Sequence, residues 1–142
     1  MDSFGSEKIR DEVLLLVARI LLVVLFFIFG WSKLMNYSGT VAFMSQEGAP
    51  VPPLAAVVAI VMEFFGSIAI ILGVFTRPLA VLLALYTLAT ALIGHHYWTM
   101  TGAAAAGNMI NFYKNVSIIG GFLLLYVTGA GRYSIDAKLR SS

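Results

Sequence analysis

The sequence predicts an all-α fold, a four-transmembrane-helix antiparallel bundle, on three observations. Hydrophobic residues make up 60% of the 142 positions and charged residues only 11%, whereas a soluble domain carries roughly 25% charged residues. The mean hydropathy is +0.92. Four apolar segments reach or nearly reach the roughly 20 residues that a helix needs to cross a bilayer. We therefore expect a single domain, residues 1–142, embedded in lipid, and the net charge of +2 gives no indication of nucleic-acid binding.

The predicted spans follow one another along most of the chain. Arg19 interrupts the first span and Glu63 the second, whereas Thr76 and Arg77 alone separate the second from the third, which predicts a tight antiparallel hairpin. Pro78 suits the first turn of a helix, where its missing N–H costs nothing. The first span is expected to stay uncleaved, because its apolar core is too long for a signal peptide. The spans cover residues 13–35, 54–75, 78–98 and 111–131.

Two longer connections lie at the end of the bundle away from the termini. The first, "YSGTVAFMSQEGAPVPP", predicts a short interfacial helix through Val41, Phe43 and Met44 that stops at Gly48. The second, "TMTGAAAAGNM", is rich in small residues. Its pattern leaves a structured segment and a flexible connector equally open.

The distribution of basic residues predicts the orientation. Lys and Arg concentrate in cytoplasmic loops. The side of the termini is expected to hold Lys8, Arg10, Arg77, Arg132, Lys138 and Arg140, and the other side Lys33 and Lys114. Both termini are therefore expected to be cytoplasmic.

Glu63 is the least expected residue of the apolar segments. It lies nine residues inside its span, roughly 14 Å deep at a rise of about 1.5 Å per residue. At that depth a carboxyl group must be paired, protonated or in contact with water. Arg19 lies only six residues inside the first span and is long enough to reach the headgroups. Arg19 and Lys33 fall on nearly the same face of that span, which we expect to point inward.

Several cationic and amide side chains sit near the outer ends of the spans, within about two helical turns of that surface. We predict that they form a polar pocket open to the outer face, with Glu63 at its floor. Glu63 is expected to share this pocket with at least two of Arg19, Lys33, His95, His96 and Lys114. The predicted ligand-binding residues are Arg19, Lys33, Glu63, His95, His96, Asn111, Lys114 and Asn115, of which Glu63, Lys114 and His95 are the catalytic candidates.

Simpler interpretations stand beside this one. Lys33 is also explained as an interface anchor, and the adjacent histidines as headgroup-level hydrogen-bonding residues. Adjacent histidines on a helix point about 100° apart, so we expect no metal site. Gly30, Gly66 and Gly73 are predicted to lie where helices approach closely.

The order of motifs resembles that of the DoxX family, small bacterial four-helix membrane proteins. The motifs are "ARILLVVLFFIFGWSKL", "EFFGSIAIILGVFTR", a histidine ending the third span, "NFYKNVSIIGGFLLL" and "GAGRYSID". The resemblance covers nearly the whole chain and implies a bacterial cytoplasmic (inner) membrane location. The family positions that it implies here are Arg19, Gly30, Lys33, Glu63, Gly73, Arg77, His95 or His96, Lys114, Ser134 and Asp136.

The resemblance implies membrane redox chemistry linked to quinones or thiol stress, alongside a redox partner protein. The arrangement also resembles that of vitamin K epoxide reductases, but this chain has no cysteine for their chemistry. Three functions stay open. The first is non-covalent binding of a quinone or similar redox-active molecule, as in an oxidoreductase subunit, with Glu63, Lys114 and a histidine on its oxygens. The second is binding or transport of a small organic anion or metabolite, and the third is a structural subunit that docks a soluble partner enzyme. Homo-oligomerisation and the presence of any catalytic activity stay open as well.

Overall fold

A computed structural model describes residues 3–142, with side chains from residue 5 onward, and the fold is all-α as predicted. The elements are α1 (Ser3–Met35), α2 (Tyr37–Gln46), α3 (Pro52–Ile60), the π-helical turn η1 (Val61–Phe65), α4 (Gly66–Leu72), α5 (Thr76–Gly94), the 3₁₀ turn η2 (Tyr97–Thr99), α6 (Gly102–Thr128) and α7 (Ile135–Arg140).

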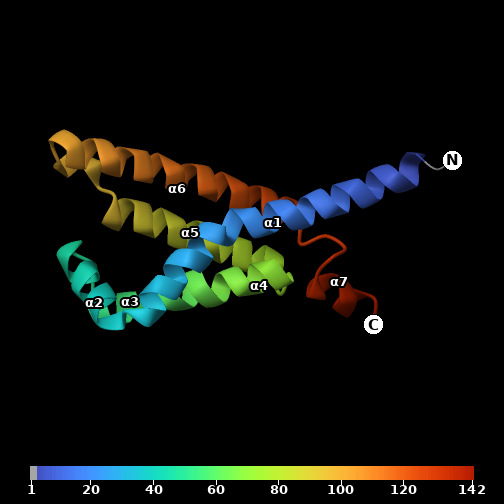
Figure 1. Ribbon diagram of the computed structural model, residues 1–142, viewed down its shortest axis with the longest axis horizontal. Coiled ribbons are helices and arrows are strands. Elements are labelled where there is room, and N and C mark those ends of the chain that lie inside the picture. Colours follow the sequence, from blue (N-terminus) through green and yellow to red (C-terminus); the bar gives the residue numbers. More distant parts are fainter. Residues whose placement is uncertain (1–2) are drawn as a thin grey trace.

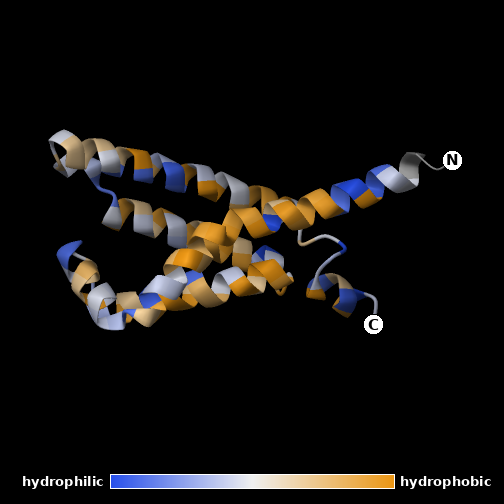
Figure 2. Ribbon diagram, in the orientation of Figure 1, coloured by the Kyte–Doolittle hydropathy of each residue, from blue (hydrophilic) through white to orange (hydrophobic). Residues whose placement is uncertain are grey.

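The four segments long and apolar enough to cross a membrane are α1, the composite helix α3–η1–α4, α5 with η2, and α6. Figure 1 shows them as two antiparallel hairpins. In the first, α1 packs against α3, η1 and α4, and in the second α5 packs along α6. Both chain ends lie at one end of the bundle, here called the terminal end, and α2 and η2 lie at the opposite loop end. Figure 2 shows apolar ribbon through the centre and polar ribbon in the first turns of α1 and in α7.

Several boundaries differ from the predicted ones. Helix α5 ends at Gly94, so His95 and His96 follow the helix directly, within the candidate span of residues 76–99. Helix α6 begins at Gly102, so the flexible-connector interpretation of the second loop is wrong, because its alanines continue the helix. The short helix predicted in the first long connection is present as α2, with the side chain of Asn36 accepting from the N–H of Gly39 at its start. Helix α7 was not predicted.

The second span contains a wide turn at its centre. In η1 the N–H of Gly66 donates to the carbonyl of Val61, five residues earlier. Such π-turns are rare and occur mostly as single turns inside α-helices, often at functional sites. Glu63 is the middle residue of this turn, and it is buried.

The core lies where the two hairpins meet. Val23 and Phe26 of α1, Ile70 of α4, Leu83 of α5 and Phe122 of α6 pack together there. The rings of Phe26 and Phe122 meet edge to face with centroids 5.6 Å apart. In lipid, helix association depends on such close packing more than on removal of apolar surface from water. This core holds α1 against both hairpins.

Gly30 allows α1 to touch the π-turn directly. A Cβ added at Gly30 would lie 2.8 Å from both the carbonyl carbon of Glu63 and the Cα of Phe64. One at Gly66 would lie 3.4 Å from Leu83 of α5. The prediction of close helix approach is confirmed at Gly30, whereas at Gly66 the added Cβ would make an ordinary van der Waals contact. Gly73 differs, because it ends α4 with a φ of +71° and packs against Ser134 of the C-terminal segment.

We expect Gly30→Ala to lower the free energy of unfolding by about 1–3 kcal/mol, because the methyl group meets backbone, which cannot move aside easily. Thermal unfolding in detergent, followed by far-UV circular dichroism, measures this. Gly120→Ala in α6 is the control, because a Cβ there meets nothing within 4 Å, and alanine favours the helix. Equal stability of the two variants would show that the α1–η1 contact can accommodate a methyl group, which would contradict the prediction.

Candidate functional site

A hydrogen-bonded triad joins three helices inside the membrane-spanning part of the protein. Lys33 Nζ of α1 donates to Glu63 Oε2 at 2.7 Å, an ion pair. The hydroxyl of Tyr86 on α5 donates to Glu63 Oε1 at 2.6 Å. Both carboxylate oxygens of Glu63 therefore have a partner, one cationic and one neutral. This set, Lys33, Glu63 and Tyr86, is called the triad below.

The triad follows from the local packing. The absence of a side chain at Gly30 lets α1 approach η1 closely, and Lys33 lies one helical turn further along the same face. The wide turn places Glu63 between α1 and α5. Tyr86 comes from α5, whose inward face also carries the buried Leu83 and Thr87. One close approach and one wide turn thus position all three side chains.

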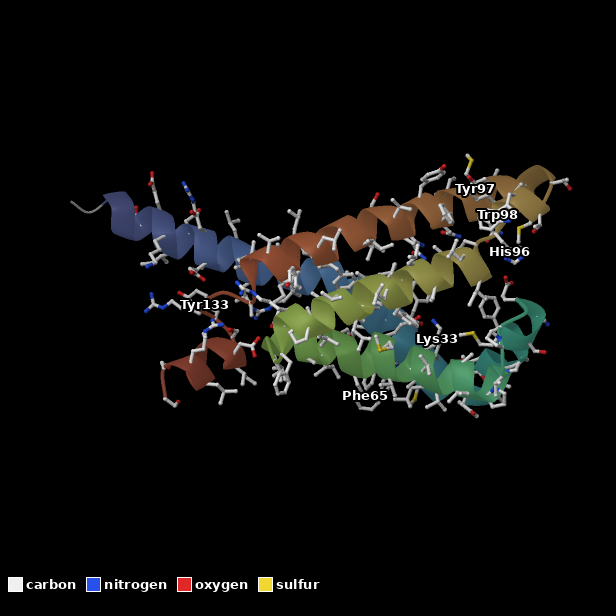
Figure 3. All side chains as sticks on the ribbon, turned by 180° about the vertical axis from the view of Figure 1, so that it is seen from behind. Lys33, Phe65, His96, Tyr97, Trp98 and Tyr133 are labelled. Atoms are coloured by element: carbon white, nitrogen blue, oxygen red, sulfur yellow. The ribbon has the colours of Figure 1, made fainter. Side chains whose placement is uncertain are left out.

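The triad is nearly closed to its surroundings but is more open on one side. The side chain of Lys33 is 21% exposed and that of Glu63 is 11% exposed. Lys33 Nζ also lies 5.6 Å from the centre of the Phe29 ring, within the range of a cation–π contact. Figure 3 shows Lys33 on the inner side of the first hairpin, facing the space between the hairpins. Lys33 is therefore the more accessible member of the ion pair.

A second polar group lies nearer the loop end, on the facing surfaces of α5 and α6. Asn115 Nδ2 donates to Thr90 Oγ1 at 3.2 Å, and Thr90 donates onward to the carbonyl of Thr87 at 2.9 Å. His95 Nδ1 lies 3.0 Å from Asn108 Oδ1. These contacts join the two helices of the second hairpin.

Lys114 lies beside this group on α6. Its Nζ donates to Asn111 Oδ1 at 3.0 Å. Gly121 lies seven residues further along α6, and seven residues turn the helix to within about 20° of the same face. A Cβ added at Gly121 would lie 2.6 Å from Leu22 of α1, so this face of α6 points toward α1. Lys114 therefore projects from the side of α6 that faces α1, and its side chain is exposed.

The predicted grouping of cations around Glu63 is only partly correct. Among the hydrogen bonds and ion pairs of residues 5–142, Lys33 is the one predicted cation that contacts Glu63. His95 and Lys114 pair with amides of α6, and His96 Nδ1 lies 2.7 Å from the carbonyl of Ile93. The helix ends before the histidines, which leaves them above Glu63 and not beside it.

Arg19 is not part of this site. Its guanidinium donates to the carbonyls of Ile71 at 2.9 Å, Tyr133 at 2.7 Å and Ala130, all at the terminal end. The residue is 1% exposed. The prediction that it shares the Glu63 pocket is wrong, because its partners are a carbonyl in the last turn of α4 and two carbonyls in the connection after α6.

The terminal end has its own polar contacts, which the sequence analysis did not find. Asp136 accepts from the N–H of Phe75 at 2.8 Å and of Thr76 at 2.9 Å, so it caps α5 from a distant part of the chain. Its own N–H donates to the carbonyl of Gly73 at 2.9 Å. Partial burial opposes ionisation of Asp136, but the hydrogen bonds from Thr76 and Phe75 and the charge of Arg140 hold its pKa below the usual range.

We expect Asp136→Asn to destabilise the protein by about 1–2 kcal/mol at neutral pH, because the amide keeps only one of the two acceptor oxygens and turns its NH₂ toward a backbone N–H. Because the pKa of Asp136 is lowered by folding, the wild-type advantage is complete above the ordinary aspartate pKa of about 4 and is lost as the pH falls through the folded-state pKa. Unfolding of both proteins between pH 3 and 7 tests this. The control is Asp11→Asn, since Asp11 pairs only with exposed Arg10. A difference that does not shrink in acid would contradict the assignment.

Tyr86 is the triad member that the sequence analysis missed. A hydroxyl in the middle of a span needs a partner, and its place eight residues after Pro78 signalled a depth similar to that of Glu63. Two cavities among the described residues lie at the terminal end, and Glu63 lines neither of them. No three His, Asp or Glu side chains of residues 3–142 are grouped to hold a metal ion.

Comparisons with known proteins agree with this architecture. The chain is 60% identical over 135 residues to inner membrane protein YphA of Escherichia coli K12, covering 95% of this chain and 94% of that protein. It is 43% identical over 132 residues to inner membrane protein YqjF of the same bacterium, covering 93% and 96%. It is also 29% identical over 125 residues to the ER-derived vesicles protein ERV29 of Saccharomyces cerevisiae, 33% of whose length it covers.

No solved structure gave a significant match to this chain. The family described as DoxX matches residues 14–96, more than half of the chain, including the Lys33–Glu63–Tyr86 triad. Together with the four spans and the two inner membrane relatives, this shows that the chain is an integral membrane protein that belongs to the DoxX family.

Proposed function

We propose that the triad and the polar group above it bind a quinone or a similar redox-active ring within the membrane. The observation that carries the proposal is a carboxylate inside a membrane span, hydrogen-bonded to both a lysine and a tyrosine. Ionisable side chains at such depth are costly and mark functional sites by default. Glu63, Lys33 and Tyr86 would be in contact with the ligand or one hydrogen bond away from it.

The hydrogen-bonding capacity of the triad supports this. An ammonium group has three N–H donors, and Lys33 uses one of them on Glu63, so others remain for a carbonyl oxygen. Reduction of a quinone to a quinol takes up two electrons, which would come from a redox partner protein, and two protons. Lys33 would donate one proton directly and Tyr86 the other by way of Glu63, and water would then restore both.

Aromatic side chains at the loop end support entry from that end. Lys33 lies on the first hairpin, and His96, Tyr97 and Trp98 lie at the loop end of the second (Figure 3). Tyr97, Trp98 and Phe112 meet edge to face with ring centroids 5.4–5.7 Å apart. Aromatic rings at this level suit an amphipathic ring that arrives from lipid.

A second candidate function is binding or transport of a small organic anion. Lys114 supports it, because this cation faces α1 and its hydrogen-bond partner is the neutral amide of Asn111. An anion bound there would gain a charge-assisted hydrogen bond without displacing a carboxylate. Lys114 and His95 would be its direct partners, and Glu63 would lie below it.

Extraction of the purified protein tests both candidates. Protein solubilised gently from its native membrane is expected to retain a molecule with quinone absorbance, in a quantity that falls at least fivefold in Lys33→Met and in Tyr86→Phe. Lys114→Met is the matched control for the quinone, because it removes the same charge outside the triad. Loss confined to Lys114→Met, of a ligand without quinone absorbance, would favour the organic anion. A protein that retains neither kind of molecule would contradict both.

We also propose that both termini face the cytoplasm, on the basis of the six basic residues expected on that side and the two on the other. The chain has no cysteine, so single cysteines introduced at Asp2 and Ser142 report orientation cleanly. We expect a membrane-impermeant thiol reagent to label them only after the membrane is opened, whereas a cysteine at Gln46 is labelled in intact cells. The reverse pattern would invert the topology.

A further inference from the structure

A cavity of about 330 Å³ lies at the terminal end, where α5 begins and α6 and α7 end. Its lining includes Phe75, Thr76, Arg77, Asp136 and Arg140. The cavity is far from the triad along the bundle, because Arg77 lies at the start of α5 and Tyr86 more than two turns further on. Neither proposed ligand of the triad uses these residues.

The charges around the cavity favour an anion. Arg77 and Arg140 contribute two guanidinium groups and Asp136 one carboxylate. Both oxygens of that carboxylate already accept backbone N–H groups, from Phe75 and Thr76, which satisfies much of its negative charge. The lining therefore keeps one positive charge in excess.

The two arginines have donors to spare. Arg77 Nη2 donates to the carbonyl of Val127 at 3.3 Å, and a guanidinium has five N–H groups. Its Nε would lie 3.2 Å from a Cβ built on Gly129, so the absence of that carbon lets the guanidinium lie flat against the backbone. Arg140 lies close enough to Asp136 to lower its pKa and has no hydrogen-bond partner among those described for residues 5–142.

One buried hydroxyl of the lining is also unpartnered. Thr76 is 1% exposed, and its Oγ1 makes no hydrogen bond of good geometry, although the hydroxyl lies close enough to the Asp136 carboxylate to help lower the pKa of that group. A buried hydroxyl without a partner costs about 1–3 kcal/mol, so such groups call for an explanation. An acceptor oxygen bound in the cavity would supply the missing partner.

We propose that this cavity binds a phosphate group, held by Arg77 and Arg140 and accepting a hydrogen bond from Thr76. Guanidinium groups match phosphate oxygens in paired, charge-assisted contacts. Two sources share this chemistry, the headgroup of an anionic phospholipid and a small phosphate ion. The rim suits the lipid, because Phe75 is 72% exposed and Leu139 66% exposed, where two spans leave the bilayer and an acyl chain would lie.

Native mass spectrometry of the full-length protein in detergent tests the proposal, with phosphatidylglycerol as the probe. Diacylglycerol with the same chains differs by the phosphoglycerol headgroup and should not be retained. We expect Arg77→Gln, Arg140→Gln and Thr76→Val each to weaken phosphatidylglycerol binding, the arginine variants about tenfold, as for loss of one charge-assisted hydrogen bond. The matched control is Arg132→Gln, an exposed arginine at the same end that does not line the cavity, and its affinity should stay within twofold of the wild type.

Inorganic phosphate distinguishes the two sources. Displacement of phosphatidylglycerol by millimolar phosphate, with the same dependence on Arg140, supports a site for small phosphate ions, and persistence of the lipid supports a headgroup site. Equal weakening in Arg132→Gln and Arg140→Gln, or equal retention of diacylglycerol, would overturn the proposal. Because Arg140 lies on the exposed last helix, its variant is expected to fold even if Arg77→Gln does not.

Discussion

Replacement of Glu63 by leucine is expected to lower the free energy of unfolding by about 3–5 kcal/mol, the usual cost of removing one partner from a buried ion pair. The variant leaves the ammonium of Lys33 without its carboxylate and the hydroxyl of Tyr86 without its acceptor, both inside a membrane span. Unfolding by a graded denaturing detergent, followed by circular dichroism, gives the difference from the wild type.

Two further variants separate charge from shape at this position. Glu63→Gln keeps an acceptor for Tyr86 and the volume of the side chain, so it should fold, yet it should lose the retained ligand because the charge is gone. The double variant Glu63→Leu with Lys33→Met removes both charges and should be more stable than Glu63→Leu alone. If the double variant is less stable than Glu63→Leu, the unpaired charge of Lys33 does not cause the loss of stability in the single variant.

Arg19→Met is expected to cost a comparable amount, about 3–5 kcal/mol, since each carbonyl left buried without a donor costs about 1–3 kcal/mol. Ile71, Ala130 and Tyr133 would all lose the donor that holds the end of α4 and the connection after α6 against α1. The same unfolding measurement applies. We also expect faster proteolysis of the C-terminal segment, because Tyr133 and α7 are held through this residue.

Arg19→Lys and Arg10→Met are the controls for this prediction. Lysine keeps the charge but not the forked geometry of the guanidinium, so it should recover part of the loss. Arg10 is an exposed arginine of the same helix that pairs with its neighbour Asp11, and its removal should cost less than about 1 kcal/mol. Full stability of Arg19→Met would mean that the carbonyls find other donors.

Composition and segment length were enough to predict the architecture, because a bilayer imposes about 20 apolar residues on each crossing helix. The inward position of Lys33, Glu63 and Arg19 was also predictable, since ionisable groups avoid lipid. What such a group binds was not predictable. From the depth of each residue along its helix, we predicted that Glu63 contacts the cations near the outer surface. In the structure, Glu63 contacts one of these cations, Lys33, and the neutral hydroxyl of Tyr86.

The remaining errors share a cause: the residue types do not reveal which backbone N–H and carbonyl groups will be free to accept or donate a hydrogen bond. Arg19 found three carbonyls at helix ends, and Asp136 found two N–H groups at the start of α5. Both pairings depend on where chain ends meet in space. The sequence also gives no sign of the wide turn around Glu63, because residues 61–65, "VMEFF", suit an ordinary α-helix as well.

That wide turn bears on how an internal carboxylate is gained or lost over generations. It holds one residue more than an ordinary α-helical turn, and the excess is absorbed locally. Deletion of one residue from it would therefore restore a regular helix while α3 and α4 keep their faces toward their neighbours. The remaining residues of the turn would change their positions, and the contacts of Glu63 with Lys33 and Tyr86 would be lost. A single codon thus separates a bundle with this internal triad from one without it.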